Sequence, residues 1–136
     1  LQRALGITVK VQLVTRKQRT VLENQAEYDL VYSGWAPDYD DPLTYIEIWT
    51  GDNPHNNSGF ANDKFDNLVQ IARTEVHPQK RMDALFEDEK ILLDEAPRIP
   101  LQLRQRAWTA QSYVKGVVRP FIGADLDFVF ASVEGK

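Results

Sequence analysis

The pattern of apolar and polar positions divides the first third of the chain into two strands and a helix. Residues 7–14 alternate and are rich in β-branched side chains, which predicts a strand. Residues 28–35 predict a second strand. Between them, Thr15 is expected to cap a short helix with Val21 and Leu22 facing inward. A helix between two such strands is typical of a βαβ unit, so we expect a parallel sheet.

The next segment predicts a short helix followed by a polar loop. Residues 43–49 are expected to be helical, with Tyr45, Ile46 and Trp49 on one side. Residues 51–59 consist mostly of glycine, proline, asparagine, aspartate and serine, which are turn formers. We therefore expect a loop at the surface there.

Two amphipathic helices follow this loop. Asn62 or Asp63 is expected to cap the first helix, and Pro78 opens the second in its first turn. Ala96-Pro97 is expected to end the second helix, because a residue before proline is biased away from helical dihedral angles. The apolar positions at helical spacing, which we expect to be buried, are Phe65, Leu68, Val69, Ala72 and Val76 in the first helix and Met82, Leu85, Phe86, Leu92 and Leu93 in the second.

The remaining sequence predicts little regular structure. Residues 98–103 are expected to form an edge strand, because Pro100 cannot donate to a strand ladder. The aromatic tail, with Phe121 and Phe128, is expected to be extended and rich in loops. No internal repeat or linker is present, so we expect residues 1–136 to form a single unit.

Composition narrows the class of protein. The apolar content of 43% is sufficient for a packed core, and the net charge of −4 argues against a nucleic-acid or anionic-membrane partner. Cysteine is absent, which excludes disulfides and thiolate chemistry. Because Met82 is the only methionine, Leu1 is not a translation start. We therefore expect the chain to be an excerpt or a processed product of a longer protein.

Residues 34–42 carry the most informative chemistry. The segment combines Trp35, two prolines that stiffen the backbone, and the carboxylates of Asp38, Asp40 and Asp41. A rigid loop at a strand end that presents an aromatic wall and acidic groups is typical of a ligand site, here one for a cation.

Three kinds of chemistry are open to these carboxylates. A calcium loop needs alternating oxygen ligands and a glycine at its turn, and the segment lacks both. A glycosidase needs two carboxyls that face each other across a bond, which neighbours in one loop do not ensure. Asp40 or Asp41, just before Pro42, suits a helix cap, and we expect this role for Asp41. For Asp38 a ligand role and a structural role both stay open.

The remaining polar residues suggest surface positions. His55 and His77 have no partner at metal-ligand spacing and fit no Ser-His-Asp arrangement, so we expect no metal site and place both at the surface. Arg98, Arg104 and Arg106 are expected to form a solvated edge.

The order of these segments resembles a known family. The stretches EYDLVYSGWAPDYDDPLTYIEIW, GFANDKFDNLVQIAR and RMDALFEDEKILLDEAPRIPL resemble the C-terminal lobe of the extracytoplasmic solute-binding proteins of peptide ABC importers, the oligopeptide- and dipeptide-binding proteins of family 5. The resemblance runs from about Leu1 to Phe121. It implies an α/β fold: a partial lobe of a type II periplasmic-binding-protein fold, with a small, mostly parallel sheet flanked by helices.

The resemblance also implies a function and its partners. It implies non-catalytic binding of a peptide between two lobes and delivery to the transmembrane subunits of an ABC permease. The second wall of the site would come from the N-terminal lobe of the same protein. The protein would lie in the periplasm or be lipid-anchored at the outer face of the cell membrane. No cofactor, metal or nucleic acid is expected.

The residues of the implied site lie in the segment described above. Ser33, Gly34 and Ala36 would offer backbone groups to an extended peptide, as in strand addition. Trp35 would wall a side-chain pocket, and Asp38 would pair with the α-ammonium group of the peptide. A charge-assisted hydrogen bond of this kind contributes roughly 1.5–3 kcal/mol.

Several departures keep other ligands open. Some oligopeptide binders carry arginines that engage ligand carboxylates, and Glu23 and Tyr32 stand at those positions here. Pro37 replaces a residue that is often small in relatives. Nickel, haem and sugar binders share the fold, a sensor domain could use the same lobe, and a hydrolase using the acidic loop is the alternative from another class.

Overall fold

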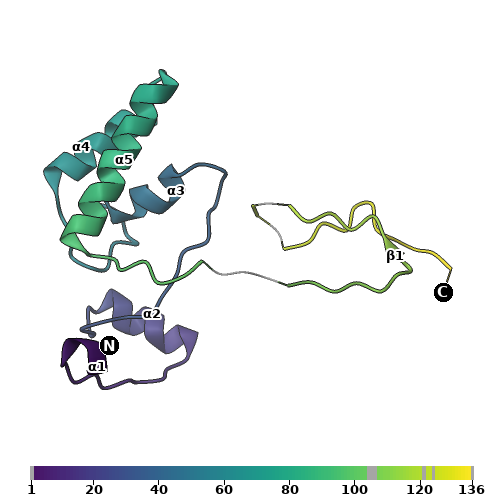
Figure 1. The fold of residues 1–136 in the computed structure, drawn as a ribbon, viewed down its shortest axis with the longest axis horizontal. Coiled ribbons are helices and arrows are strands. Elements are labelled where there is room, and N and C mark those ends of the chain that lie inside the picture. The colour runs from purple at the N-terminus through teal and green to yellow at the C-terminus, as the bar shows by residue number, and fades with distance from the viewer. Residues whose placement is uncertain (1, 104–106, 121, 124, 136) are drawn as a thin grey trace. The chain divides into compact units, whose positions relative to one another are not determined.

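The computed structural model describes residues 2–103, 107–120, 122–123 and 125–135. The chain separates into two compact units, Leu1–Ser33 and Gly34–Lys136, which we describe one at a time (Figure 1). The first contains the helices α1 (Gln2–Leu5) and α2 (Arg16–Asn24). The second contains α3 (Leu43–Ile46), the 3-10 helix η1 (Glu47–Trp49), α4 (Asp63–Thr74), α5 (Pro78–Glu95), β1 (Val114–Lys115) and β2 (Ser132–Val133).

Helix α2 of the first unit begins as predicted. The Thr15 hydroxyl accepts a hydrogen bond from the Gln18 backbone N–H at 3.3 Å, and the Gln18 side chain accepts one from the Thr15 N–H at 3.0 Å. This reciprocal pair is a capping box, which satisfies two backbone donors at the helix start. The inward position predicted for Val21 is wrong, because this side chain is 47% exposed, whereas Leu22 is half-buried.

The strands predicted at residues 7–14, 28–35 and 98–103 are not formed. A strand exists only when its backbone pairs with a neighbour, and the sheet in the described residues contains β1 and β2 alone. Leu13, in the first of these segments, is 93% exposed. The alternating pattern therefore indicates extended backbone, and in the described residues these segments are not part of the sheet.

The sheet is antiparallel, where the sequence predicted parallel strands. Val114 pairs with Val133, and an isolated bridge joins Val118 to Asp127 further along the same ribbon. Gly116 has φ +68, and a side chain there would lie 1.9 Å from the Phe130 carbonyl oxygen, so only glycine fits. Two short strands joined by a long loop agree with the predicted extended tail.

Some predictions concern residues outside the described part of the chain. Arg104 and Arg106, two members of the predicted basic cluster, lie outside it, as does Phe121 of the aromatic tail. Among the residues that are described, no helix has both the length and the apolar character that crossing a membrane requires.

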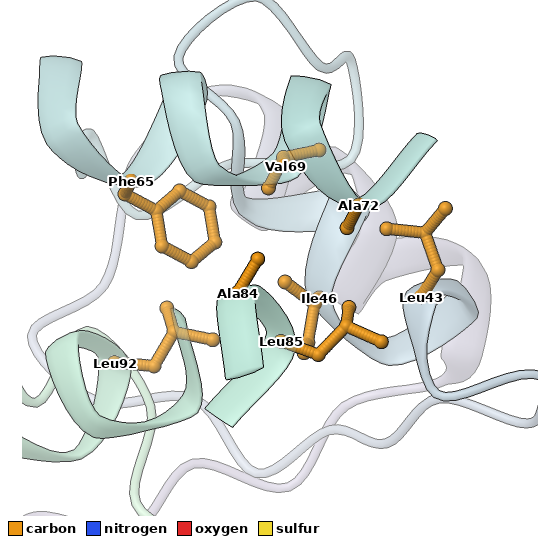
Figure 2. Close-up of a cluster of buried hydrophobic side chains, with 8 residues drawn as sticks. All are labelled: Leu43, Ile46, Phe65, Val69, Ala72, Ala84, Leu85 and Leu92. Atoms are coloured by element: carbon orange, nitrogen blue, oxygen red, sulfur yellow. The ribbon is translucent and has the colours of Figure 1, made fainter. Parts of the chain in front are cut away.

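The core lies between α3, α4 and α5 (Figure 2). Figure 1 shows α4 and α5 side by side, with α3 against them. Phe65 and Val69 are fully buried on α4, and Leu85 and Leu92 face them from α5. The complete cluster is Leu43, Ile46, Phe65, Val69, Ala72, Ala84, Leu85 and Leu92.

The burial predicted for α4 and α5 is correct for most apolar residues and wrong for Val76, Phe86 and Leu93. Leu68 and Met82 are half-buried, and Ala72 is buried as expected. Val76 is 94% exposed because α4 ends at Thr74, two residues earlier. Phe86 and Leu93 are also exposed, so the buried stripe of α5 is narrower than its sequence suggests.

The helix ends follow local chemistry. Asn62 caps α4 by accepting a hydrogen bond from the Phe65 N–H at 3.0 Å. Pro78 occupies the first turn of α5, and His77 caps that helix by accepting from the Lys80 N–H at 3.5 Å. Ala96, with φ 51, ends α5 in the left-handed region. His77 is therefore a capping residue, a role that the sequence did not indicate.

The helix predicted at residues 43–49 is present in two parts, α3 and η1. The three residues predicted to share one side differ in burial: Ile46 is buried, Trp49 is half-buried and Tyr45 is exposed. Thr44 is also buried. Residues 51–59 form a loop of consecutive turns, as predicted.

Candidate ligand-binding site

The residues predicted to bind ligand form one continuous exposed segment. Ser33 ends the first unit, and Gly34, Trp35, Ala36 and Asp38 begin the second. All are exposed except Trp35, which is half-buried. The backbone N–H and C=O groups of residues 33–36 make no hydrogen bond within the described part of the chain. These groups are free to pair with another extended backbone.

Asp41 ties this segment to the helical core. Its carboxylate accepts a hydrogen bond from the Leu43 N–H at 2.9 Å and forms an ion pair with Arg81 at 2.8 Å. Arg81 also donates to the Ala72 carbonyl at 2.8 Å, so it joins α4, α5 and the loop. The hydrogen bond from Arg81 holds the pKa of Asp41 below its usual range. Asp41 therefore binds the first backbone N–H of α3 from one residue before the cap position, which Pro42 occupies instead of the predicted Asp41.

Tyr39 forms a second anchor. Its hydroxyl donates to the carboxylate of Glu47, and the same carboxylate forms an ion pair with Arg73 at 3.0 Å. Desolvation and the neighbouring Glu47 raise the pKa of Tyr39 to about 12, so the phenol stays neutral. Tyr39 is thus a structural donor rather than an acid or base.

Two carboxylates of the segment, those of Asp38 and Asp40, take no part in these contacts. Asp38 and Asp40 are exposed, and their carboxylates make no hydrogen bond or ion pair with described residues. The Asp38 backbone is fixed, because its N–H donates to the buried Thr44 hydroxyl at 3.2 Å. Asp38 therefore presents a free carboxylate from a positioned backbone.

The arrangement does not favour metal or hydrolytic chemistry. Within the described ranges, no three histidine or carboxylate side chains gather where they could hold a metal ion. Asp41, the neighbour of the two exposed carboxylates, is paired with Arg81. An open hollow beside the segment is lined by Tyr39, Asp40 and Tyr45 among others, but neither Trp35 nor Asp38 contributes to it.

The polar loop places His55 against Trp35, a contact that the sequence did not predict. The rings of Trp35 and His55 lie 5.0 Å apart between centroids and are tilted by 58°. The loop itself is closed by the Asn56 amide, which donates to the carbonyls of Trp49, Thr50 and Phe60 at 3.2, 3.1 and 2.8 Å. The asparagines between residues 53 and 57 could have indicated this closed loop, because asparagine side chains form turns by hydrogen-bonding nearby backbone groups.

The described residues form part of a periplasmic-binding-protein fold. The chain superposes on the Listeria monocytogenes oligopeptide-binding protein OppA bound to peptide with a TM-score of 0.82 and 29% identity, over 99% of this chain and 25% of that one. The predicted periplasmic-binding-protein fold is thereby confirmed, whereas the mostly parallel sheet predicted with it is not found in the described residues. No family model matches the chain.

Several curated peptide-binding proteins are similar to this chain. Dipeptide-binding protein DppE of Bacillus subtilis is 31% identical over 125 residues, which is 90% of this chain and 23% of the relative. Peptide transport periplasmic protein SapA of Haemophilus influenzae is 38% identical over 130 residues, again 90% of this chain and 23% of the relative. The chain is therefore homologous to the peptide-binding proteins of solute-binding protein family 5. It spans about a quarter of the length of the relatives it matches.

Proposed function

We propose that this chain is part of the C-terminal lobe of an extracytoplasmic protein that binds peptides without catalysis and delivers them to an ABC permease. The observation that carries the proposal is the exposed, unbonded backbone of residues 33–36 next to the free carboxylate of Asp38. Homology to proteins named for dipeptide and oligopeptide binding favours a peptide over nickel, haem or sugar.

Each feature has a part in peptide capture. Gly34 and Ala36 pair with the main chain of an extended peptide, which every peptide possesses, so many sequences are accepted. Asp38 binds the α-ammonium group, and its free carboxylate has no competing partner among the described residues. Trp35 provides an apolar wall for one ligand side chain.

The binding site is completed by a second lobe. The chain spans about a quarter of its relatives, so the opposite wall and the closure that removes water come from the rest of the protein. The 136 residues alone are expected to bind peptide only feebly, because both contacts and desolvation depend on closure. SapA is named a periplasmic protein, which supports a place outside the cytoplasm, there free or anchored by lipid.

The test uses the full-length protein, tri-alanine and isothermal calorimetry. Asp38→Ala is expected to weaken tri-alanine binding at least tenfold, the equivalent of about 1.4 kcal/mol. Acetylating the amino terminus of the peptide removes the ammonium charge, so the acetylated peptide is expected to bind both proteins with similarly low affinity.

Asp40→Ala is the matched control. Asp40 is exposed and free like Asp38 but lies beyond it in the loop, so this variant is expected to retain the affinity of the wild type within about twofold. An Asp38→Ala protein that binds tri-alanine as tightly as the wild type would remove the ammonium anchor from the proposal.

A further inference from the structure

The indole of Trp35 is oriented by packing alone. Its Nε1 is buried and donates to no acceptor among the described residues. Its ring contact is with His55, at 5.0 Å between centroids and a tilt of 58°. A tilted pair of aromatic rings has a preferred geometry, because the positive edge of one ring is attracted to the negative face of the other. Removing the His55 ring would therefore remove one contact that orients the indole.

His55 is itself held in place by the polar loop. Its backbone N–H donates to the Asn53 side-chain oxygen at 2.9 Å. The Asn53 amide donates in turn to the Glu47 carbonyl at 2.9 Å, which fixes this part of the loop on η1. Asn56 closes the loop on the other side of His55. The imidazole is thus presented to Trp35 by a structured turn rather than by a mobile one.

We propose that His55 is a positioning residue, which holds the indole of Trp35 at the angle that selects an aromatic or other large apolar side chain of the bound peptide. This rests on the proposed function, since Trp35 is the pocket wall only if the protein binds peptides. The indole remains partly accessible while His55 covers one side of it. The uncovered part is the surface available to a ligand side chain.

The experiment measures selectivity rather than affinity alone. Binding of tri-alanine and of the three tripeptides with phenylalanine in place of one alanine is measured by calorimetry on the full-length protein. The wild type is expected to prefer phenylalanine at one position. His55→Ala is expected to reduce that preference by about twofold to tenfold, the range of one aromatic pair, and His55→Phe is expected to restore most of it.

Two further measurements separate positioning from a fault in folding. Fluorine NMR of fluorotryptophan, with the Trp35 signal assigned by Trp35→Phe, is expected to show that signal shifted and broadened in His55→Ala. His77→Ala changes the other histidine, which caps α5, and is expected to leave both the selectivity and the Trp35 signal unchanged.

The outcomes are distinguishable. If the wild type binds none of the peptides, the proposed function fails and the inference falls with it. If tri-alanine binds but the preference is absent, survives His55→Ala, or is not restored by His55→Phe, the inference is overturned while peptide binding stands. Equal losses for tri-alanine and the phenylalanine peptide in His55→Ala would also overturn it, because selectivity would then be untouched.

Discussion

Asp88 is a fully buried carboxylate on α5, within the helical core. Its exposed fraction is 0%, and neither oxygen has a hydrogen-bond partner among the described residues. Desolvation, and next the negative charge of Asp66, raise the pKa of Asp88 from 3.8 to about 7. The folded protein therefore holds a proton on Asp88 at acidic pH that the unfolded chain has already released.

The difference between the folded and unfolded pKa values of Asp88 sets how the free energy of unfolding changes with pH. Folded Asp88 binds its proton more tightly, so its contribution to the free energy of unfolding is fully present below about pH 4 and is lost as pH rises through about 7. Each pKa unit corresponds to about 1.4 kcal/mol, so a rise of roughly three units gives a loss of about 4 kcal/mol. This figure is an upper bound, because water and side-chain movement relieve part of the charge burial.

The perturbation is Asp88→Asn, which keeps the size of the side chain and removes its titration. Urea unfolding followed by far-ultraviolet circular dichroism is measured for the variant and the wild type from about pH 4 to about pH 8. We expect similar stabilities at pH 4 and a variant more stable by about 2–4 kcal/mol at pH 8. Taking the difference between the two proteins cancels the titration of groups that they share.

Asp94→Asn is the matched control for this series. Asp94 is exposed on the same helix, so its substitution is expected to change the stability by less than about 0.5 kcal/mol at every pH. A stability difference between Asp88→Asn and the wild type that stays constant across the pH range would refute the reasoning.

Two further predictions concern the loop and a helix end. Asn56→Ala removes an amide that donates to three carbonyls, and it is expected to lower the free energy of unfolding by about 1–3 kcal/mol in urea titrations; a loss below about 0.5 kcal/mol would mean that the loop is closed by other contacts. Ala96→Gly relieves a left-handed backbone with φ 51 and is expected to raise the free energy of unfolding by about 0.5–1 kcal/mol in thermal denaturation; an unchanged or lower midpoint would contradict this.

The helices of this protein could be predicted because their signals are local. Thr15, Asn62 and Pro78 act within one turn of the helix starts that they mark, so their roles follow from neighbours in sequence. The burial of Phe65 and Val69 follows from helical periodicity. The narrower stripe of α5 could not be predicted, because it depends on how closely α4 covers that helix.

The strands were mispredicted for the opposite reason. Residues 7–14 have the composition of a strand, but a strand needs a ladder with a second segment distant in sequence, and in the described residues only β1 and β2 form a sheet. The short antiparallel pair of β1 and β2 depends on residues 17 positions or more apart, such as Val114 and Val133. Alternation alone gives neither the partner nor its direction.

In the candidate site, too, local contacts could be predicted from the sequence and long-range contacts could not. The hydrogen bond of Asp41 to the start of α3 could be expected from its place before Pro42. Its partner Arg81 lies 40 residues away and meets it only because α5 packs on α3 and α4. Glu47 and Arg73 are 26 residues apart and depend on the same packing. The contact of His55 with Trp35 likewise needed the fold of the intervening loop.

These long-range pairs decide which charges the loop can offer to a ligand. Arg81 forms an ion pair with Asp41, and Arg73 forms one with Glu47. The charges of these two acidic groups near the segment are therefore neutralised by residues of the helical core. The carboxylates of Asp38 and Asp40 have no such partner among the described residues, and the Asp38 backbone is fixed by the Thr44 hydroxyl. An anchored carboxylate loses less freedom when it binds a cation than a mobile one does. In the site that we propose, the loop would therefore supply the carboxylate of Asp38, and α3, α4 and α5 would fix the position of the loop.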